Sequence, residues 1–312
     1  MRQIQTNKGN GKRYRYSAYG IRIDSEIELS ELQLTDDADV DIAVKYEDLS
    51  RFIPREPFTG AKYCCPEKNK FLFLVDKVAA FYVSGGDEIL VHPYDKVDLA
   101  IIKLYLLGTS MGILLMQRGM APLHGSTVVM NQRGVIFTGA SGAGKSTIVA
   151  ELRKRGFSML SDDVSAIQRD DQGIYFVQPG YPQQKLWGSS AEMIGLDVSQ
   201  FHQVLIDEDK YAVPVQEGFW ELPAPVGRIY EIVIGPCERV VIEPLSGLEK
   251  ARVIMENIYR VEVMASLGLQ QSHFTQCVGM ATQAEVFRLT RPENRISLEQ
   301  QADLIISHCQ NE

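Results

Sequence analysis

The sequence predicts a mixed α/β (α+β) fold in two parts, a small β-rich N-terminal domain and a larger core built around a glycine-rich segment. Three observations carry this prediction. Short β-like runs fill residues 1–95, a glycine-rich segment at 139–147 lies between a β-like run and a helical pattern, and 312 residues suffice for two domains. We therefore expect one domain over residues 1–95 and a second over residues 96–312.

Composition excludes several classes of protein. A hydrophobic share of 45% and a charged share of 23% are typical of a water-soluble globular chain. The formal net charge of −8 argues against a nucleic-acid-binding surface, which needs a basic stripe. Five cysteines without the spacing of metal ligands predict free thiols in a reducing cytosol.

Two segments bear on membrane targeting. Residues 1–8 contain no apolar core and therefore predict no signal peptide. The most hydrophobic run, 104–116, is too short to span a bilayer and belongs to a longer amphipathic pattern that begins near Asp98, which favours a buried helix. The sequence thus predicts a soluble cytoplasmic protein that does not bind membranes.

Short β-like runs dominate the N-terminal part. Turn signals such as Gly85 and Gly86 separate them, which predicts β-hairpins, and we find no recognisable chemistry in this part. A long helix over about 98–118 is expected to lead into the core. The predicted strands lie at 17–23, 40–44, 71–75, 79–83 and 88–91.

The core begins with a predicted β-hairpin. Two apolar runs, 122–130 and 135–138, flank the turn sequence Asn-Gln-Arg-Gly at 131–134. The second run leads into the glycine-rich segment, so the strand before it runs antiparallel from His124, which lies beside Gly139. From there the imidazole of His124 could touch a phosphate or an acidic side chain, although most single histidines are structural.

The segment at 139–147 reads GASGAGKST and matches the pattern G-x-x-x-x-G-K-[ST] in full. Glycines let successive backbone N–H groups point into one concave nest at a helix N-terminus, which binds polyphosphate. Lys145 is expected to reach the β- and γ-phosphates, and Ser146 is expected to ligate Mg²⁺. A strand pattern before the segment and a helical pattern at 147–155 make a chance glycine-rich loop the weaker interpretation. The predicted phosphate-binding residues are Gly139, Ala140, Ser141, Gly142, Ala143, Gly144, Lys145, Ser146 and Thr147.

An acidic pair, Asp162 and Asp163, follows after one predicted helix and one short strand at 157–160. In a parallel strand–loop–helix–strand unit, these carboxylates return to the sheet edge that carries the glycine-rich segment. One would then bind Mg²⁺ and the other would act as base for an incoming hydroxyl, provided that an irregular strand end lets both side chains serve. A helix N-cap or a solvated turn is the alternative.

Two lysines further along are candidates for substrate binding. Lys185 lies in an aromatic-rich stretch with Tyr181 and Trp187, which suits a peptide groove. Lys210 follows an acidic stretch, so a surface ion pair explains it equally well. Cations are expected near the reacting group because charge develops on the equatorial oxygens of a transferred phosphoryl group. Helices near 248–266 and 298–309 and a strand at 284–289 are expected to complete the core.

In order and spacing, several segments of this core resemble the HPr kinase/phosphorylase family. They are His124-Gly-Ser, the hairpin, the glycine-rich segment, Arg155-Gly156 and the run Ser-Asp-Asp-Val at 161–164. Segments 19–32, 179–187 and 209–211 are most similar to the HPr-kinase-related branch, which includes the kinases of lasso-peptide gene clusters. The resemblance extends over most of the chain and is strongest at 124–164.

The resemblance implies a fold related to phosphoenolpyruvate carboxykinase and to the C-terminal domain of HPr kinases, with ATP and Mg²⁺ as cofactors. It also implies phosphorylation of a serine hydroxyl on a peptide or small protein, and a homo-oligomer. Carried over by position, Lys145 and Ser146 hold phosphates and Mg²⁺. Asp162 and Asp163 supply the metal contact and the base, with Asp163 favoured as the base and the choice between them left open, while His124 lies near the reacting phosphate.

One difference from the family bears on the substrate. True HPr kinases carry a Glu-x-Arg-Gly-x-Gly segment tied to the reverse, phosphate-driven dephosphorylation and to HPr contact, and no such segment occurs at 164–216. This difference argues against phosphorylase activity and against HPr as substrate. The predicted acceptor is therefore the C-terminal serine of a lasso-peptide precursor. Three alternatives stay open: an HPr(Ser) kinase, carboxykinase-type chemistry on a small acid, and a non-catalytic nucleotide-binding regulator.

Overall fold

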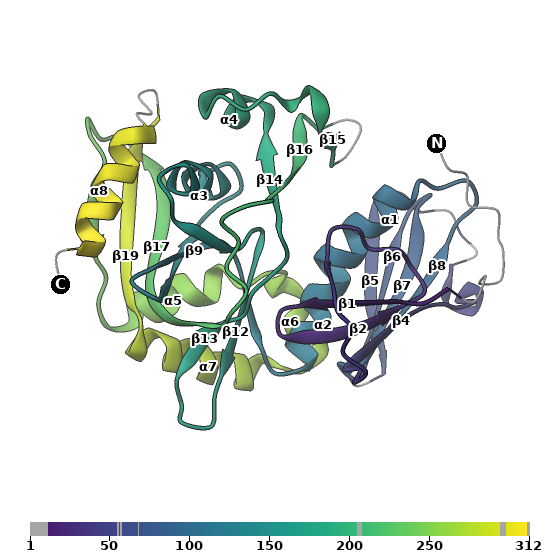
Figure 1. The fold of residues 1–312 in the computed structure, drawn as a ribbon. Helices are drawn as coiled ribbons and strands as arrows, with labels where there is room; N and C mark the ends of the chain where they lie inside the picture. Colours follow the sequence, from purple (N-terminus) through teal and green to yellow (C-terminus); the bar gives the residue numbers. More distant parts are fainter. Residues whose placement is uncertain are drawn as a thin grey trace. The chain divides into compact units, whose positions relative to one another are not determined.

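The computed structural model describes residues 12–54, 56, 58–67, 69–204, 208–293 and 298–310. The predicted absence of a signal peptide concerns residues 1–8, which lie outside this set. The chain is a mixed α/β protein that divides into two compact units (Figure 1). The first comprises Met1–Met120 and Arg260–Ser272, and the second comprises Ala121–Tyr259 and His273–Glu312.

Within the described residues, the first unit contains one eight-stranded sheet with the strand order β3-β1-β2-β4-β8-β7-β6-β5. Strands β2, β4 and β8 run parallel to one another, and the other neighbours are antiparallel. The bounds are β1 Tyr14–Ala18, β2 Ile21–Ser25, β3 Gln33–Leu34, β4 Ile42–Tyr46, β5 Ala61–Glu67, β6 Lys70–Val75, β7 Ala79–Ser84 and β8 Glu88–Pro93, with a short 3₁₀ turn, η1, at Ser50–Phe52.

The strands predicted at 40–44, 71–75, 79–83 and 88–91 correspond to β4, β6, β7 and β8. The strand predicted at 17–23 is wrong, because the chain turns at Tyr19 and Gly20 and forms the hairpin of β1 and β2. Both turn residues have positive φ, 56° and 68°, as a two-residue hairpin turn requires. Strand β5 was not predicted.

The helix predicted over 98–118 is present as α1 (Leu99–Tyr105), a π-helical turn η2 (Leu106–Ser110) and α2 (Met111–Gln117). By length and composition alone this run of 19 residues could also cross a membrane, but 67% of its most apolar stretch is buried inside the protein. Tyr105 packs on the first unit's sheet, with its ring centre 5.7 Å from that of Phe73 and 6.4 Å from that of Phe81. These aromatic contacts explain why the run belongs to the first unit, whereas the sequence analysis assigned it to the second domain.

The larger sheet of the second unit has the order β10-β9-β12-β13-β17-β19-β18 among the described residues, with β11 also paired to β9. Because β10 also pairs with β17, five of these strands close into a ring. The bounds are β9 Ala121–Met130, β10 Arg133–Thr138, β11 Ser158–Ser161, β12 Val164–Arg169, β13 Tyr175–Val177, β17 Ala224–Gly235, β18 Val241–Pro244 and β19 Glu285–Pro292. A smaller sheet has the order β14 (Gln183–Trp187), β16 (Lys210–Pro214) and β15 (His202–Gln203).

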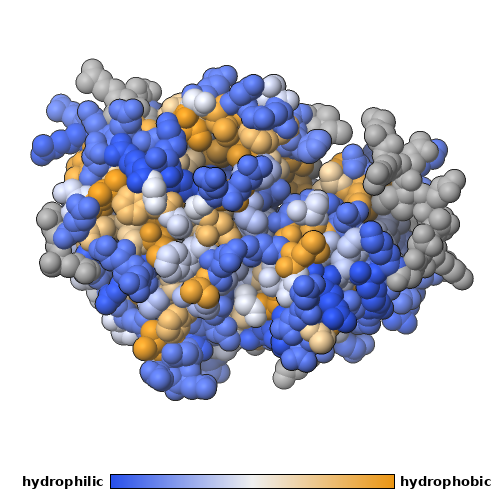
Figure 2. Space-filling view, viewed as in Figure 1, coloured by the Kyte–Doolittle hydropathy of each residue, from blue (hydrophilic) through white to orange (hydrophobic). Residues whose placement is uncertain are grey.

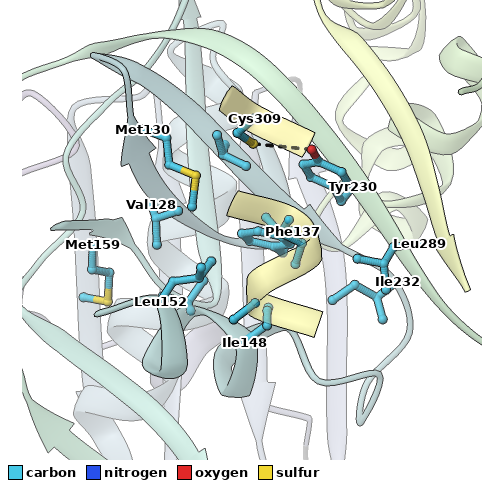
Figure 3. Packing of buried hydrophobic residues seen from close by; sticks show 14 of the residues in the cluster. Val128, Met130, Phe137, Ile148, Leu152, Met159, Tyr230, Ile232, Leu289 and Cys309 are labelled. Atoms are coloured by element: carbon cyan, nitrogen blue, oxygen red, sulfur yellow. Dashed lines mark hydrogen bonds between the residues drawn. The ribbon is translucent and has the colours of Figure 1, made fainter. Parts of the chain in front are cut away.

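Helices α3 and α8 pack with the larger sheet around one apolar core (Figure 3). Phe137 of β10 stacks on Tyr230 of β17 at 5.5 Å between ring centres, and Ile148 and Leu152 of α3 reach the same cluster. This packing fixes the end of β10, from which the glycine-rich loop leaves. The face shown in Figure 2 carries hydrophobic side chains interspersed among hydrophilic ones. The helices are α3 Lys145–Lys154, α4 Gly188–Met193, α5 Gly247–Glu256, α6 Val261–Leu267, α7 Gln270–Gln283 and α8 Leu298–Gln310, with a 3₁₀ turn, η3, at Val198–Gln200.

The helix predicted near 298–309 and the strand predicted at 284–289 are confirmed as α8 and β19. The helix predicted over 248–266 is interrupted between α5 and α6, and α7 was not predicted. At the interruption the Tyr259 N–H donates to the Pro122 carbonyl, and the Asn257 carbonyl accepts from the His124 N–H, each over 2.8 Å. These bonds to the start of β9 replace the helical ones.

Candidate active site

The hairpin of β9 and β10 places His124 beside the loop that follows β10. Asn131 and Gln132, with φ of 49° and 61°, form its two-residue turn, as predicted. At the open end, the Thr138 hydroxyl donates to the His124 carbonyl over 2.9 Å, and Val164 of β12 pairs with His124 from the other side. His124 therefore lies between the end of β10 and the beginning of β12.

The glycine-rich loop, residues 139–144, turns the chain from β10 into α3. Gly139, Gly142 and Gly144 have φ of 130°, 80° and 106°, a region that favours glycine. At Gly139 a Cβ atom would also lie 2.5 Å from the Ile232 carbonyl oxygen, so a larger residue does not fit. The Gly139 N–H donates to the Asn257 side chain over 3.0 Å, which fixes the start of the loop.

Lys145, the first residue of α3, folds its side chain back over the loop. Its ammonium donates to the carbonyls of Gly139 and Ala140 over 2.8 Å and 3.0 Å. Burial lowers the pKa of Lys145 to about 8, although the carboxylates of Asp163 and Asp162 raise it. A polyphosphate in the loop would give this desolvated ammonium an anionic partner, which is a stronger acceptor than a carbonyl.

The acidic pair lies between β11 and β12. Strands β10 and β11 both run antiparallel to β9, so they are parallel to each other and the carboxylates return to the loop end of the sheet, as expected. Asp163 has a φ of 69°, which turns the chain between the two strands. The irregular strand end sends the two side chains to different places, Asp162 into the interior and Asp163 into a pocket.

Asp162 is held in the interior by two donors. The Ser126 hydroxyl donates to Oδ1 over 2.6 Å, and the Lys185 N–H donates to Oδ2 over 2.7 Å. Burial raises the pKa of Asp162, although the Lys185 N–H, the Ser126 hydroxyl and the nearby Ser146 hydroxyl lower it. Asp162 thus ties the end of β11 to β9 and to β14.

Asp163 and His124 lie in contact. His124 Nδ1 is 3.1 Å from the Asp163 carbonyl oxygen and 3.7 Å from its Oδ1. Because a carbonyl can only accept, Nδ1 is the donor here, which leaves Nε2 as the acceptor of a neutral ring. Burial, followed by the charge of Lys145, lowers the pKa of His124 and favours this neutral ring. Burial raises the pKa of Asp163, but the charge and hydrogen bond of Lys185, together with His124 and Lys210, outweigh it and hold the pKa below its usual range, so Asp163 is ionised at neutral pH.

The two candidate substrate lysines both reach the pocket. Lys185 of β14 is buried, and its Nζ lies 2.8 Å from Asp163 Oδ2. Burial lowers the pKa of Lys185, but Asp163 together with Tyr181 and Tyr259 outweighs this and raises the pKa above its ordinary value. Lys210 of β16 is half-buried, and its Nζ lies 5.6 Å from the centre of the Trp187 ring.

These side chains line one pocket that encloses about 530 Å³ of space and opens to solvent. His124, Asp163, Lys185 and Lys210 contribute to it, together with Ser126, Leu186, Trp187 and Ser190. Of the nine predicted phosphate-binding residues, six line the pocket: Ser141, Gly142, Gly144, Lys145, Ser146 and Thr147. Gly139, Ala140, Ala143 and Asp162 are not among the described residues that line it.

The donor set at the first turn of α3 suits a magnesium ion. The Ser146 hydroxyl, close enough to lower the pKa of Asp162, and the Asp162 carboxylate are hard oxygen donors, and Mg²⁺ commonly takes one or two protein oxygens together with phosphates and water. Among the described residues, no group of three or more His, Cys, Asp and Glu side chains could hold a metal ion. These residues therefore fit Mg²⁺ when a bound polyphosphate supplies further ligands, and they do not form a complete metal site by themselves.

Sequence reasoning missed several residues that shape the site. Gln184 is buried and donates to the Ser146 carbonyl over 2.8 Å, which joins β14 to α3. Arg291 of β19 donates to the Ala143 carbonyl over 2.9 Å and supports the loop from below, as Asn257 supports its start. Gln184 could have been noticed as the strand neighbour of Lys185, whereas Arg291 and Asn257 lie far along the chain without any local signal.

Residues 118–218 match the family described as HPr Serine kinase C-terminal domain, and this range contains all the predicted site residues. Over 105 residues the chain is 30% identical to the HPr kinase/phosphorylase of Listeria welshimeri and to that of Listeria monocytogenes, which covers 31% of this chain and 34% of each relative. Over 52 residues it is 42% identical to the HPr kinase/phosphorylase of a Geobacillus species, which covers 17% of each chain.

These matches relate the core of the chain to HPr kinases, while the chain spans about a third of the length of the curated relatives that it matches, 34% for the Listeria proteins. A solved structure, that of the Hpr(Ser) kinase/phosphatase from Coxiella burnetii, aligns with 60% of this chain and 89% of its own at 12% identity. Its TM-score of 0.32 is too low to support an argument about the fold. The carboxykinase-like architecture therefore stays a prediction.

Proposed function

We propose that the protein is an ATP-dependent kinase that phosphorylates a serine hydroxyl of a peptide or small protein. One observation carries the proposal: the ionised Asp163 carboxylate, the Lys145 ammonium and the first turn of α3 meet in one solvent-open pocket. Phosphoryl transfer to a hydroxyl needs these parts together, a phosphate-binding loop with a lysine and a carboxylate at the acceptor. The match of residues 118–218 to the HPr Serine kinase C-terminal domain supports the same activity.

In this proposal the glycine-rich loop and Lys145 hold the phosphates of ATP. Ser146 and Asp162 would hold Mg²⁺, which when bound neutralises charge on the phosphate oxygens. The acceptor oxygen forms a bond to the γ-phosphorus while the bond from that phosphorus to the β,γ-bridging oxygen breaks, and ADP leaves with the released electron pair. The hydroxyl proton passes to a carboxylate.

We assign that carboxylate to Asp163, because Asp163 lines the pocket while the oxygens of Asp162 are engaged by Ser126 and Lys185. A low pKa makes Asp163 a weak base. That is sufficient in a loose transition state, where the hydroxyl loses its proton late and the carboxylate mainly orients it. In the neutral His124 ring the proton lies on Nδ1, which donates to the Asp163 carbonyl. Nε2 of the neutral ring could donate to the transferred group only if this proton moved to Nε2, and that would break the bond to Asp163. We therefore assign His124 the role of holding Asp163.

The acceptor we propose is the C-terminal serine of a lasso-peptide precursor. This choice rests on the resemblance of segments 19–32, 179–187 and 209–211 to the HPr-kinase-related branch and on the missing Glu-x-Arg-Gly-x-Gly segment. The curated relatives are named HPr kinase/phosphorylase, which makes the HPr protein the second candidate acceptor. We further propose a cytoplasmic location and a homo-oligomer.

The test is phosphoryl transfer from γ-labelled ATP to a short peptide ending in serine and, in parallel, to HPr. Asp163→Asn is expected to lower the transfer rate by roughly 10²- to 10⁴-fold, because the acceptor hydroxyl loses its carboxylate. Asp171→Asn, at an exposed position, is the matched control and should leave the rate unchanged. Transfer to HPr but not to the peptide would select the second acceptor. ATP binding without transfer to either would leave a nucleotide-binding regulator and refute the kinase proposal.

A further inference from the structure

The two lysines at the acceptor side of the pocket differ in what neutralises them. The Lys185 ammonium already has its counterion, Asp163 Oδ2, at 2.8 Å. Within the described part of the chain Lys210 forms no ion pair, and its ammonium rests on the ring of Trp187. The Lys185 ammonium is thus neutralised by the proposed base, whereas the Lys210 ammonium can form an ion pair with a ligand.

Strand geometry places Lys210 on the same side as the reacting groups. Lys185 and Trp187 are two residues apart in β14, so their side chains leave the same face of the small sheet. Lys210 is the direct cross-strand partner of Trp187, and all three side chains line the pocket.

The position of Lys210 is fixed by its surroundings. The Gly188 N–H donates to the Asp209 carbonyl over 2.8 Å, directly beyond the Trp187 and Lys210 pair. The Asp209 carboxylate lies against Gly188, where a Cβ atom would be 2.4 Å from its Oδ2. The Trp187 ring, 38% exposed, forms a flat support that holds the ammonium by a cation–π contact at the mouth of the pocket.

Among the described residues, the charges in the pocket leave one cation for the acceptor. Lys145 lies at the loop, on the nucleotide side, and Lys185 is balanced by Asp163. The positive charge of Lys210 also reaches the site, because it lowers the pKa of both His124 and Asp163. An acceptor that carries a carboxylate would neutralise the Lys210 ammonium. A partly desolvated ion pair of this kind discriminates strongly between a charged ligand and its neutral analogue.

We propose that Lys210, supported by Trp187, is an acceptor-binding site for a carboxylate that lies beside the phosphorylated hydroxyl. This inference rests on the proposed kinase function and adds to it a specificity-determining residue. For an acceptor serine at the end of a peptide, the ligand is its α-carboxylate. Lys185, by contrast, is a positioning residue that acts through Asp163.

The test compares two short synthetic peptides of the same sequence that end in serine, one with a free α-carboxylate and one with a C-terminal amide. The wild-type protein is expected to phosphorylate the free acid with a kcat/KM roughly 10- to 100-fold above that of the amide, chiefly through KM. Lys210→Gln should reduce this ratio to near one by raising KM for the acid, and Lys210→Arg should retain most of it. Trp187→Ala should lower the ratio in part.

Lys62→Gln is the matched control, because Lys62 also lies over an aromatic ring, that of Phe58, but belongs to the first unit. It should leave the ratio unchanged. Equal use of acid and amide by the wild type would overturn the carboxylate site while leaving the kinase in place. A Lys210→Gln variant that keeps the preference for the acid would also overturn it. No transfer to either peptide or to HPr, with ATP bound, would overturn the kinase and this site together.

Discussion

The two units of the protein differ in whether they bury charged side chains. Among the described residues, the buried polar side chains of the first unit are uncharged, namely Ser25, Thr109 and Ser110. Most of its ion pairs are accessible to solvent, as in the pair of Arg22 and Asp41 with 34% and 23% of the side chains exposed. The pair of Lys103 and Glu31 is the exception among the described residues, with 12% and 19% exposed. The second unit buries six charged side chains: Lys145, Glu151, Asp162, Lys185, Arg228 and Arg291.

Burying a charge is costly unless it is paired and hydrogen-bonded, so a unit that does so repeatedly has a local reason. Four of the six charges belong to the site, because Lys145, Asp162 and Lys185 surround the pocket and Arg291 supports the loop. Arg228 is paired elsewhere, with Glu285. The comparison suggests that the first unit is stabilised by its apolar sheet, and that the second gives up some stability to hold reactive charges in place.

Among the variants that compare the two units, the largest effect is expected at Lys145. Lys145→Ala should lower kcat/KM for ATP-dependent transfer by roughly 10²- to 10³-fold, since a cation aimed at developing phosphate charge is lost. The matched variant in the first unit is Lys45→Ala, which breaks the accessible pair with Glu88 and should leave transfer unchanged. Transfer assays of both variants decide this. Equal losses would contradict the assignment of chemistry to the second unit.

The next effect concerns the buried ion pair. Lys185→Met keeps the length of the side chain but leaves Asp163, with only 19% of its side chain exposed, without its cation, which should lower the free energy of unfolding by about 3–5 kcal/mol. Arg22→Gln in the first unit removes an accessible pair and should give a much smaller change. Chemical denaturation measures both. A Lys185→Met protein as stable as the wild type would refute the contrast between the units.

Glycine substitutions extend the comparison of the two units to backbone conformation. Gly139→Ala combines a φ of 130° with a Cβ that meets the Ile232 carbonyl oxygen, and should cost about 1–3 kcal/mol of stability and weaken ATP binding. Gly60→Ala in the first unit has a φ of 73° but open space around it, so only the smaller conformational cost applies. Thermal unfolding and ATP titration of both variants are the measurements. An unperturbed Gly139→Ala protein would mean that the loop is free to relax.

The smallest effect is a pH dependence of ATP binding. Burial lowers the pKa of Lys145 to about 8, so the ammonium is charged below that pH and neutral above it. Because phosphate binds the charged form, affinity should fall about tenfold between pH 7 and pH 9, with proton uptake on binding at the alkaline end. Calorimetry in buffers of different ionisation enthalpy measures that uptake. Lys145→Arg should remove the dependence, because a guanidinium does not titrate in this range; a dependence that persists in this variant would assign it to another group.

Several features of the site could be predicted from sequence because neighbouring residues determine them. The positive φ of Gly142 and Gly144 and the helix at Lys145 follow from the motif itself, and the turn of Asn131 and Gln132 follows from the residues between two apolar runs. These local preferences act over a few residues, so they survive in any surrounding structure. The pairing of His124 with the end of β10 then follows from strand length alone.

Tertiary structure alone decided the rest. The adjacent carboxylates of Asp162 and Asp163 look equivalent in the sequence, and their different roles come from donors on two other elements, β9 and β14. The difference between Lys185 and Lys210 likewise depends on which of them packs against Asp163. Arg291 reaches the loop across 148 residues of chain, and contacts of that kind depend on the closure of the whole sheet. Local backbone preference is encoded in a segment, whereas burial and charge pairing arise only when distant segments meet.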